Sequence, residues 1–135
     1  MYGETDWRRL LIDMRPEMNP GCYVFTTGRR HPAGVTLVVT VAEREGLTPV
    51  LRQEDAEAAG PGYDYVAGWL ALRVHSALDA VGPTAAVAHE LARAGVSCNV
   101  VAGFHHDHLF VPYEVADRAM DLLEGLSHRS AADVA

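Results

Sequence analysis

Four consecutive residues, His105, His106, Asp107 and His108, carry side chains that can bind a metal ion or exchange protons near neutral pH. If His106 and Asp107 form a tight turn, His105 and His108 face each other across a β-hairpin and could share one ion. Asp107 or His75 could then supply a third ligand. Adjacent strand residues cannot all reach one ion, however, and no Glu is placed to act as a base. We therefore expect no metal and no cofactor, and a pH-sensitive contact or an ordinary hairpin tip is the simpler interpretation.

A second polar group precedes a predicted helix that begins at Pro83, where the missing N–H of proline costs nothing. A helix N-terminus presents unpaired N–H groups and a partial positive charge, which favour a carboxylate. Gly82 lets a ligand approach the backbone, and Ser76 and Thr84 add hydroxyl groups. Asn99, expected near this loop, could hold an amino group through its side-chain carbonyl. The alternative is that Ser76 and Thr84 only cap the helix or stabilise the loop through hydrogen bonds, and that Asn99 is a polar strand residue that binds no ligand.

No nucleophile in the chain has the surroundings that catalysis requires. Ser76 follows His75, but sequence neighbours point apart, and no strained Gly-x-Ser-x-Gly turn is present. Cys98 lies in a predicted strand without an activating base. The segment 60–62 lacks the lysine of a phosphate-binding loop. The sequence therefore predicts a binding protein rather than an enzyme.

The composition is that of a globular protein with a substantial core. Of 135 residues, 49% are hydrophobic and 21% are charged, and the formal net charge is -7. With short basic clusters at Arg8–Arg9 and Arg29–His31, this acidic balance argues against nucleic acid as a partner. No apolar run approaches the ~18 residues that a membrane-spanning helix needs. Because Glu4 and Asp6 precede any apolar stretch, we expect a cytoplasmic protein.

The second half of the chain has the clearer pattern of strands and helices. Leu70, Leu72 and Val74 alternate with Trp69 and Arg73, as in a strand with two different faces. The expected elements are a strand within 66–74, a helix at 83–94, strands at 96–104 and 109–111, and a helix at 114–126. Because crossover connections are right-handed, both helices are expected on one face of an antiparallel sheet. This order predicts an α+β fold of the ferredoxin-like βαββαβ type.

The first half repeats part of this order. We expect a helix at 7–14, strands at 22–26, 35–44 and 47–51, and a helix at 53–59. Pro16 and Pro20–Gly21 are expected to end the first helix and form a turn, and Glu45–Gly46 to close a hairpin. The strand at 22–27 could complete either sheet. The expected domains are a degenerate half at 1–62, a complete unit at 63–127 and a disordered tail at 128–135.

Two long segments resemble the ACT-domain family. The first is 75–84 (HSALDAVGPT) followed by 91–96 (LARAGV), and the second is 99–101 followed by 106–112 (HDHLFVP). In particular, they resemble bacterial tandem-ACT proteins of unassigned function, and more distantly the ACT repeats of amino-acid sensors and of aspartate kinase. The resemblance is strong over 65–126 and weak before residue 60.

What the resemblance implies is a regulatory protein that binds a small molecule, an amino acid, where two units meet. The ligand-binding residues expected on this basis are His75, Ser76, Val81, Gly82, Pro83, Thr84, Asn99 and Val100. A homodimer is expected because antiparallel sheets with free edges tend to pair. Two alternatives stay open: a metal-binding enzyme that uses His105, Asp107 and His108, and a module that binds only other proteins.

Overall fold

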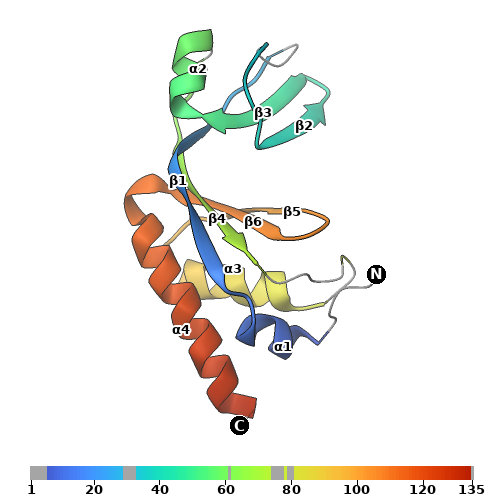
Figure 1. The fold of residues 1–135 in the computed structure, drawn as a ribbon, viewed down its shortest axis with the longest axis vertical. Helices are drawn as coiled ribbons and strands as arrows, with labels where there is room; N and C mark the ends of the chain where they lie inside the picture. The colour runs from blue at the N-terminus through green and yellow to red at the C-terminus, as the bar shows by residue number, and fades with distance from the viewer. Residues whose placement is uncertain (1–5, 29–32, 61, 74–77, 79–80, 135) are drawn as a thin grey trace.

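The computed structural model describes residues 6–28, 33–60, 62–73, 78 and 81–134. The described chain forms a six-stranded antiparallel sheet in the order β2-β3-β1-β4-β6-β5 (Figure 1). The strands are β1 (Pro16–Phe25), β2 (Val39–Glu43), β3 (Gly46–Arg52), β4 (Val66–Leu72), β5 (Asn99–Ala102) and β6 (Asp107–Pro112). The helices are α1 (Trp7–Ile12), α2 (Gln53–Ala59), α3 (Pro83–Arg93) and α4 (Ala116–Val134), with a 3₁₀ turn at Tyr113–Val115.

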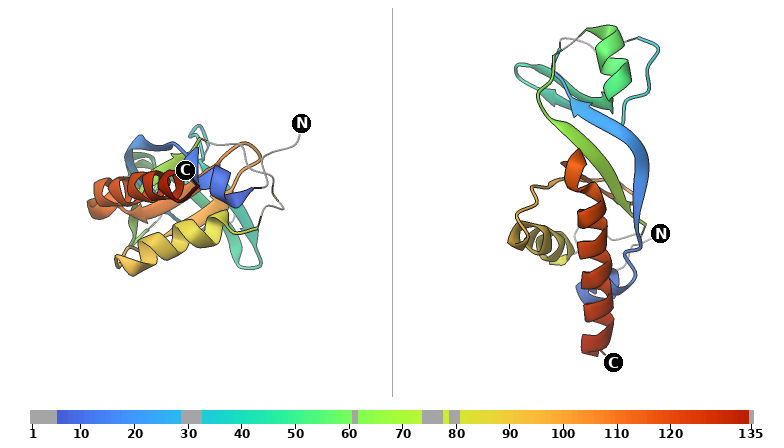
Figure 2. Two further views of the ribbon diagram at one scale, coloured as in Figure 1. Left: turned by 90° about the horizontal axis from the view of Figure 1, so that it is seen from below. Right: turned by 90° about the vertical axis from the view of Figure 1, so that its left-hand side faces the viewer.

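The expected ferredoxin-like α+β architecture, with its helices on one face of the sheet, is confirmed. Alternate residues of β4 separate the two faces: Leu70 and Leu72 pack against α3 and α4, whereas Trp69 packs on the other face. Val66, on the helical side of the same strand, packs with Ala56 of α2. In Figure 2, α3 and α4 lie side by side against the sheet.

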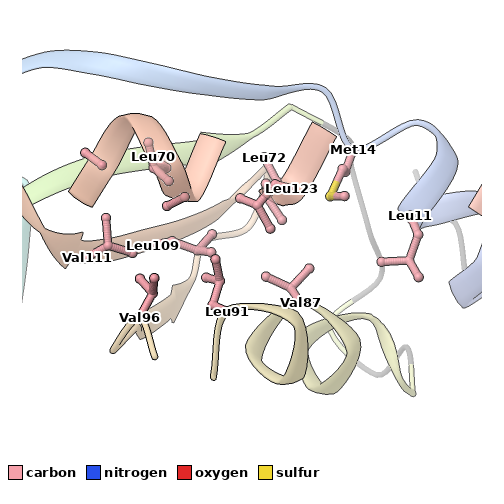
Figure 3. Packing of buried hydrophobic residues seen from close by; sticks show 12 residues of the cluster. Leu11, Met14, Leu70, Leu72, Val87, Leu91, Val96, Leu109, Val111 and Leu123 are labelled. Carbon is pink, nitrogen blue, oxygen red and sulfur yellow. The ribbon is translucent and has the colours of Figure 1, made fainter. Parts of the chain in front are cut away.

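The main core lies between this sheet face and the helices α1, α3 and α4 (Figure 3). Its buried residues are Leu11, Met14, Leu70, Leu72, Val87, Leu91, Val96, Leu109, Val111, Ala116, Ala119 and Leu123. The apolar positions that the helical period predicts at 86, 87, 91 and 94 and at 115, 119, 122, 123 and 126 all contribute to it. Burying each large side chain stabilises the fold by roughly 1.5–3 kcal/mol.

The first strand differs from the expectation. Pro16 and Pro20–Gly21 do not form a turn; they lie within β1, which pairs with β4 from Pro16 onward. The register shifts between Asn19 and Tyr23, and Gly21, with a φ of +99°, accommodates that irregularity. Because β1 also pairs with β3, it joins both halves of the chain into a continuous sheet rather than completing one of two.

Two details of the β2–β3 hairpin also differ. Residues 35–38 precede β2 instead of extending it, although the amide of Val38 donates to Val50. Glu43 pairs with Gly46, so the turn consists of Arg44 and Glu45 and not of Glu45–Gly46. A Cβ atom at Gly46 would lie 2.6 Å from the carbonyl oxygen of Gly28, and the glycine is therefore required by a close backbone approach.

The expectation of a disordered tail at 128–135 is wrong for residues up to Val134, which continue α4. Tertiary contacts stabilise this extension. The hydroxyl of Ser127 donates to the carbonyl of Ile12 at 2.7 Å, and Arg129 forms an ion pair of 2.7 Å with Glu90 of α3. Within the described part of the chain, no helix is both long and apolar enough to cross a membrane.

Candidate functional site

A small apolar pocket lies where α1, the start of α3 and one end of the sheet meet. Its lining residues are Leu10, Leu11, Met14, Leu72, Pro83, Thr84, Val87, Val100, Asp107 and Leu109. Its free volume is about 10 Å³, enough for one water molecule. Figure 3 shows Leu11, Met14, Val87 and Leu72 converging on this region from α1, α3 and the sheet. The pocket is therefore formed but nearly filled by the protein's own side chains.

The N-terminus of α3 supplies the backbone groups of the site. Gly82 is the N-cap, with a φ of +108° that favours glycine, and Pro83 follows at the first helical position. The first helical amide bond runs from Ala86 to the carbonyl of Gly82 at 2.9 Å. The amides of Thr84 and Ala85 consequently have no carbonyl partner within the helix, and Gly82 has no side chain to cap them.

Trp7 of α1 lies against this turn. A Cβ atom at Gly82 would lie 3.2 Å from Cγ of the Trp7 ring, so the glycine allows α1 to approach α3. This contact could not be predicted from a local pattern, because the two residues are far apart along the chain. Leu10, Leu11 and Met14 line the pocket, although their spacing predicted only one face of a helix.

Asp107 is the charged residue of the pocket lining. It is half-buried, and this burial raises the pKa of its carboxyl, while His108 and His106 act in the opposite direction. Among the residues that the structure describes, no side chain donates a hydrogen bond to this carboxylate or forms an ion pair with it. An incoming cationic group could therefore pair with this carboxylate without displacing an ion-pair partner among the described residues.

The expected ligand-binding residues are only partly brought together. Pro83, Thr84 and Val100 line the pocket, and Gly82 adjoins it. Val81 is 82% exposed and is absent from the lining. The remaining expected positions within the loop, 75 and 76, lie outside the described residues.

Asn99 is placed differently from the expectation. It pairs with Phe110, and its strand neighbour Val100 faces the pocket, so the side chain of Asn99 lies on the opposite face of the sheet. The strand alternation could have shown this, because Asn99 and Val100 cannot both face one site.

The expected pairing of His105 with His108 is wrong. Ala102 pairs with Asp107, so the hairpin turn spans residues 103–106 and His108 lies opposite Val101. Gly103 makes this wider turn possible: its amide donates to the carbonyl of His106 at 2.9 Å, and a Cβ atom would lie 2.8 Å from that oxygen. Across the described residues, no three His, Cys, Asp or Glu side chains are grouped to hold a metal ion.

His108 instead belongs to an aromatic cluster on the helix-free face. Its Nδ1 accepts a hydrogen bond of 3.1 Å from Nε1 of Trp69, so Nδ1 carries no proton. The Trp69 ring stacks on Phe110 and meets Tyr23 edge-on, with centroid separations of 6.3 and 5.2 Å. These contacts fix the start of β6, whose next residue toward the tip is Asp107.

We expect His108 to titrate below its ordinary range in the folded protein. Burial lowers the pKa of His108 and His106 lowers it further, while Asp107 raises it. Since the folded state then binds fewer protons than the unfolded state, this histidine contributes stability above its unfolded pKa of about 6.5, which is lost as pH falls through the lower folded value. An NMR titration of the imidazole checks this. In Trp69→Phe the pKa should rise, and an unchanged pKa would show that the hydrogen bond does not favour the neutral ring.

Comparison with known proteins connects this geometry to a family. Two models described as the ACT domain match the chain, one over residues 2–68 and the other over residues 65–125. A crystal structure of a Vibrio cholerae protein of unknown function, described as a possible transport protein, is 41% identical with a TM-score of 0.80. That match covers 89% of this chain and 94% of the other. No functionally curated protein matches the chain.

More distant solved structures share the fold. An Agrobacterium tumefaciens protein is 22% identical with a TM-score of 0.65, over 83% of this chain and 87% of that one. The ligand-free regulatory subunit of aspartate kinase from Thermus thermophilus is 9% identical with a TM-score of 0.62, over 82% of this chain and 95% of that one.

Proposed function

Because this chain belongs to the ACT-domain family, we propose that it is a regulatory protein that binds an amino acid at the pocket beside the N-terminus of α3. ACT units are small-molecule-binding regulatory modules. The observation that carries the proposal is that apolar walls, the first residues of α3 (Pro83 and Thr84) and the half-buried Asp107 line one pocket. The amides of Thr84 and Ala85, at the start of the same helix, have no partner within it. Together these features complement the carboxylate, the ammonium and the side chain of an amino acid.

We propose that the protein has no catalytic activity of its own. Burial raises the pKa of the Cys98 thiol to about 11, so this cysteine is protonated near neutral pH and is a poor nucleophile. The histidines of the β5–β6 turn, which the metal-enzyme alternative requires, are not paired as that alternative predicts. Its action would therefore be exerted on a separate partner.

A thermal-shift screen of the purified protein against the common amino acids, with and without a chelator, tests the proposal. A ligand that binds only the folded state must raise the melting temperature. We expect a saturable rise for a small set of amino acids that the chelator does not affect. No rise for any amino acid would contradict the proposal and favour a module that binds other proteins.

We also propose that the protein is a homodimer whose sheets join at their edges. The outer edges of β2 and β5 pair with no described strand, and unpaired edges tend to find partners. Val41, 45% exposed on β2, lies on one of these edges. Sedimentation at micromolar concentration should give a dimer, which Val41→Lys should weaken if β2 forms the contact. A wild-type monomer would contradict the dimer without affecting the proposed ligand.

A further inference from the structure

We propose that the pocket selects an amino acid with an aliphatic or thioether side chain, and that α1 occupies the space of that side chain until it is displaced. This inference rests on the proposed function. It concerns which ligand the pocket accepts and how access to it is regulated.

Side chains of the protein itself fill the pocket. Leu10, Leu11 and Met14, from α1 and the residues that follow it, are 2%, 3% and 1% exposed and line one side of it. The facing wall is equally apolar, being made of Leu72, Val87, Val100 and Leu109. Two leucines and a methionine are thus the protein's own occupants of this space. A ligand side chain that replaces them must match their shape and polarity, because a charged group would lose its hydration there.

The polar end of the ligand would meet two groups of opposite charge. Asp107 and the start of α3 line the same pocket, so a negatively charged carboxylate and the partial positive charge of a helix N-terminus are both available to a ligand. An ammonium group can pair with the carboxylate of Asp107, and a carboxylate group can accept from the amides of Thr84 and Ala85. A zwitterion satisfies both ends, whereas a simple hydrocarbon, amine or fatty acid satisfies at most one.

Tertiary contacts hold α1 in place. Its six residues are too few for a helix that is stable alone, so it depends on tertiary contacts. Among these are the hydrogen bond from Ser127 Oγ to the carbonyl of Ile12, at 2.7 Å, and the bond from the amide of Arg73 to the carbonyl of Met14, at 2.8 Å. Arg15, between α1 and β1, has a φ of +42°, a left-handed conformation that costs a non-glycine residue energy and that opening could release.

Calorimetry with leucine, isoleucine and methionine, against aspartate, lysine and serine, tests the selectivity of the full-length protein. We expect binding of the apolar group only. Asp107→Asn should weaken binding at least about tenfold, since a hydrogen-bonded charge is lost. Asp121→Asn, at an exposed position of α4, is the matched control and should have no effect. Binding of the polar amino acids with equal affinity would overturn the ligand class and leave the proposed function standing.

Ser127→Ala tests the displacement of α1. Removing one hydrogen bond from the closed form should raise the affinity for leucine or methionine about fivefold. Ser130→Ala is the control, because its hydroxyl bonds to Leu126 within α4 and not to α1. Without any ligand, Ser127→Ala should also speed hydrogen exchange at the α1 amides of Leu10 and Asp13 but not in β4 or β6.

Each result of the two measurements can be read separately. Faster exchange confined to α1 supports a displaceable helix even if no amino acid binds, in which case the proposed function fails. Exchange of α1 at the same rate as the core strands, unchanged in Ser127→Ala, would overturn the displacement of α1 whatever binds.

Discussion

Replacing Gly68 by alanine is expected to lower the free energy of unfolding by about 1–3 kcal/mol, the usual cost of overpacking a core. Gly68 lies in β4 beneath the start of α4, and a Cβ atom there would lie 2.8 Å from the Cβ of Ala116. Real Cβ atoms do not approach so closely, so either the helix or the strand must shift. Because β4 lies at the centre of the sheet, that shift would spread to the main core.

Denaturant unfolding of Gly68→Ala measures this loss, with Gly62→Ala as control because a Cβ atom at Gly62 meets nothing within 4 Å. Ala116→Gly should cost up to about 1 kcal/mol alone, as glycine does within a helix. When Gly68→Ala is made in the Ala116→Gly background, it should lower the free energy of unfolding by less than it does in the wild type. The reason is that Ala116→Gly has removed the methyl group with which the new Cβ atom clashes. Additive losses would show that the contact with Ala116 is not what makes Gly68 necessary.

Leu91→Ala is expected to have the largest effect of any single truncation in α3, about 2–5 kcal/mol. The side chain is 0% exposed and packs in the main core (Figure 3). Its removal leaves a cavity between α3 and the sheet in addition to the lost burial. Its backbone carbonyl also accepts from Val96, so Leu91 holds the end of the helix against the chain that leads to β5.

The same substitution at Leu78 is the matched control, because that side chain is 69% exposed and its truncation should change stability by less than about 0.5 kcal/mol. Both free energies come from urea unfolding followed by circular dichroism. Equal small losses at the two positions would contradict the placement of Leu91 in the core.

The local periodicity of the sequence was sufficient to predict many of the strands and helices of the fold. The alternation around Leu70 and Leu72 and the helical stripes of α3 and α4 each report the burial of one face, and burial is a property that a short window of sequence retains. The helix at Gln53–Ala59 was placed with its observed bounds, because Gly60 ends it in a left-handed conformation.

The misplaced elements depend on contacts between distant residues. Prolines usually interrupt strands, yet β1 continues past Pro20 because pairing with β4 and β3 outweighs a local irregularity. The last turns of α4 are polar enough to predict disorder, but Ser127 and Arg129 bond to α1 and α3. Neither partner can be identified from a local window.

The candidate site was predictable only where its residues carry a local signal. The Gly82–Pro83 start of a helix is a local signal, and the structure places it at a pocket. Asp107 was recognised for its chemistry but assigned to a histidine hairpin, because the width of the turn at Gly103 depends on a backbone approach to His106. Trp7 and Met14 reach the site only through the tertiary placement of α1.

The most direct test of the central claim is an NMR titration of isotope-labelled protein with leucine and with methionine, followed through the backbone amides. We predict saturable shifts concentrated at Thr84, Ala85, Asp107 and the residues of α1, with the amides of α2 and β2 unchanged. Shifts that cluster away from the start of α3, or no shifts at all with either amino acid, would contradict binding at this pocket.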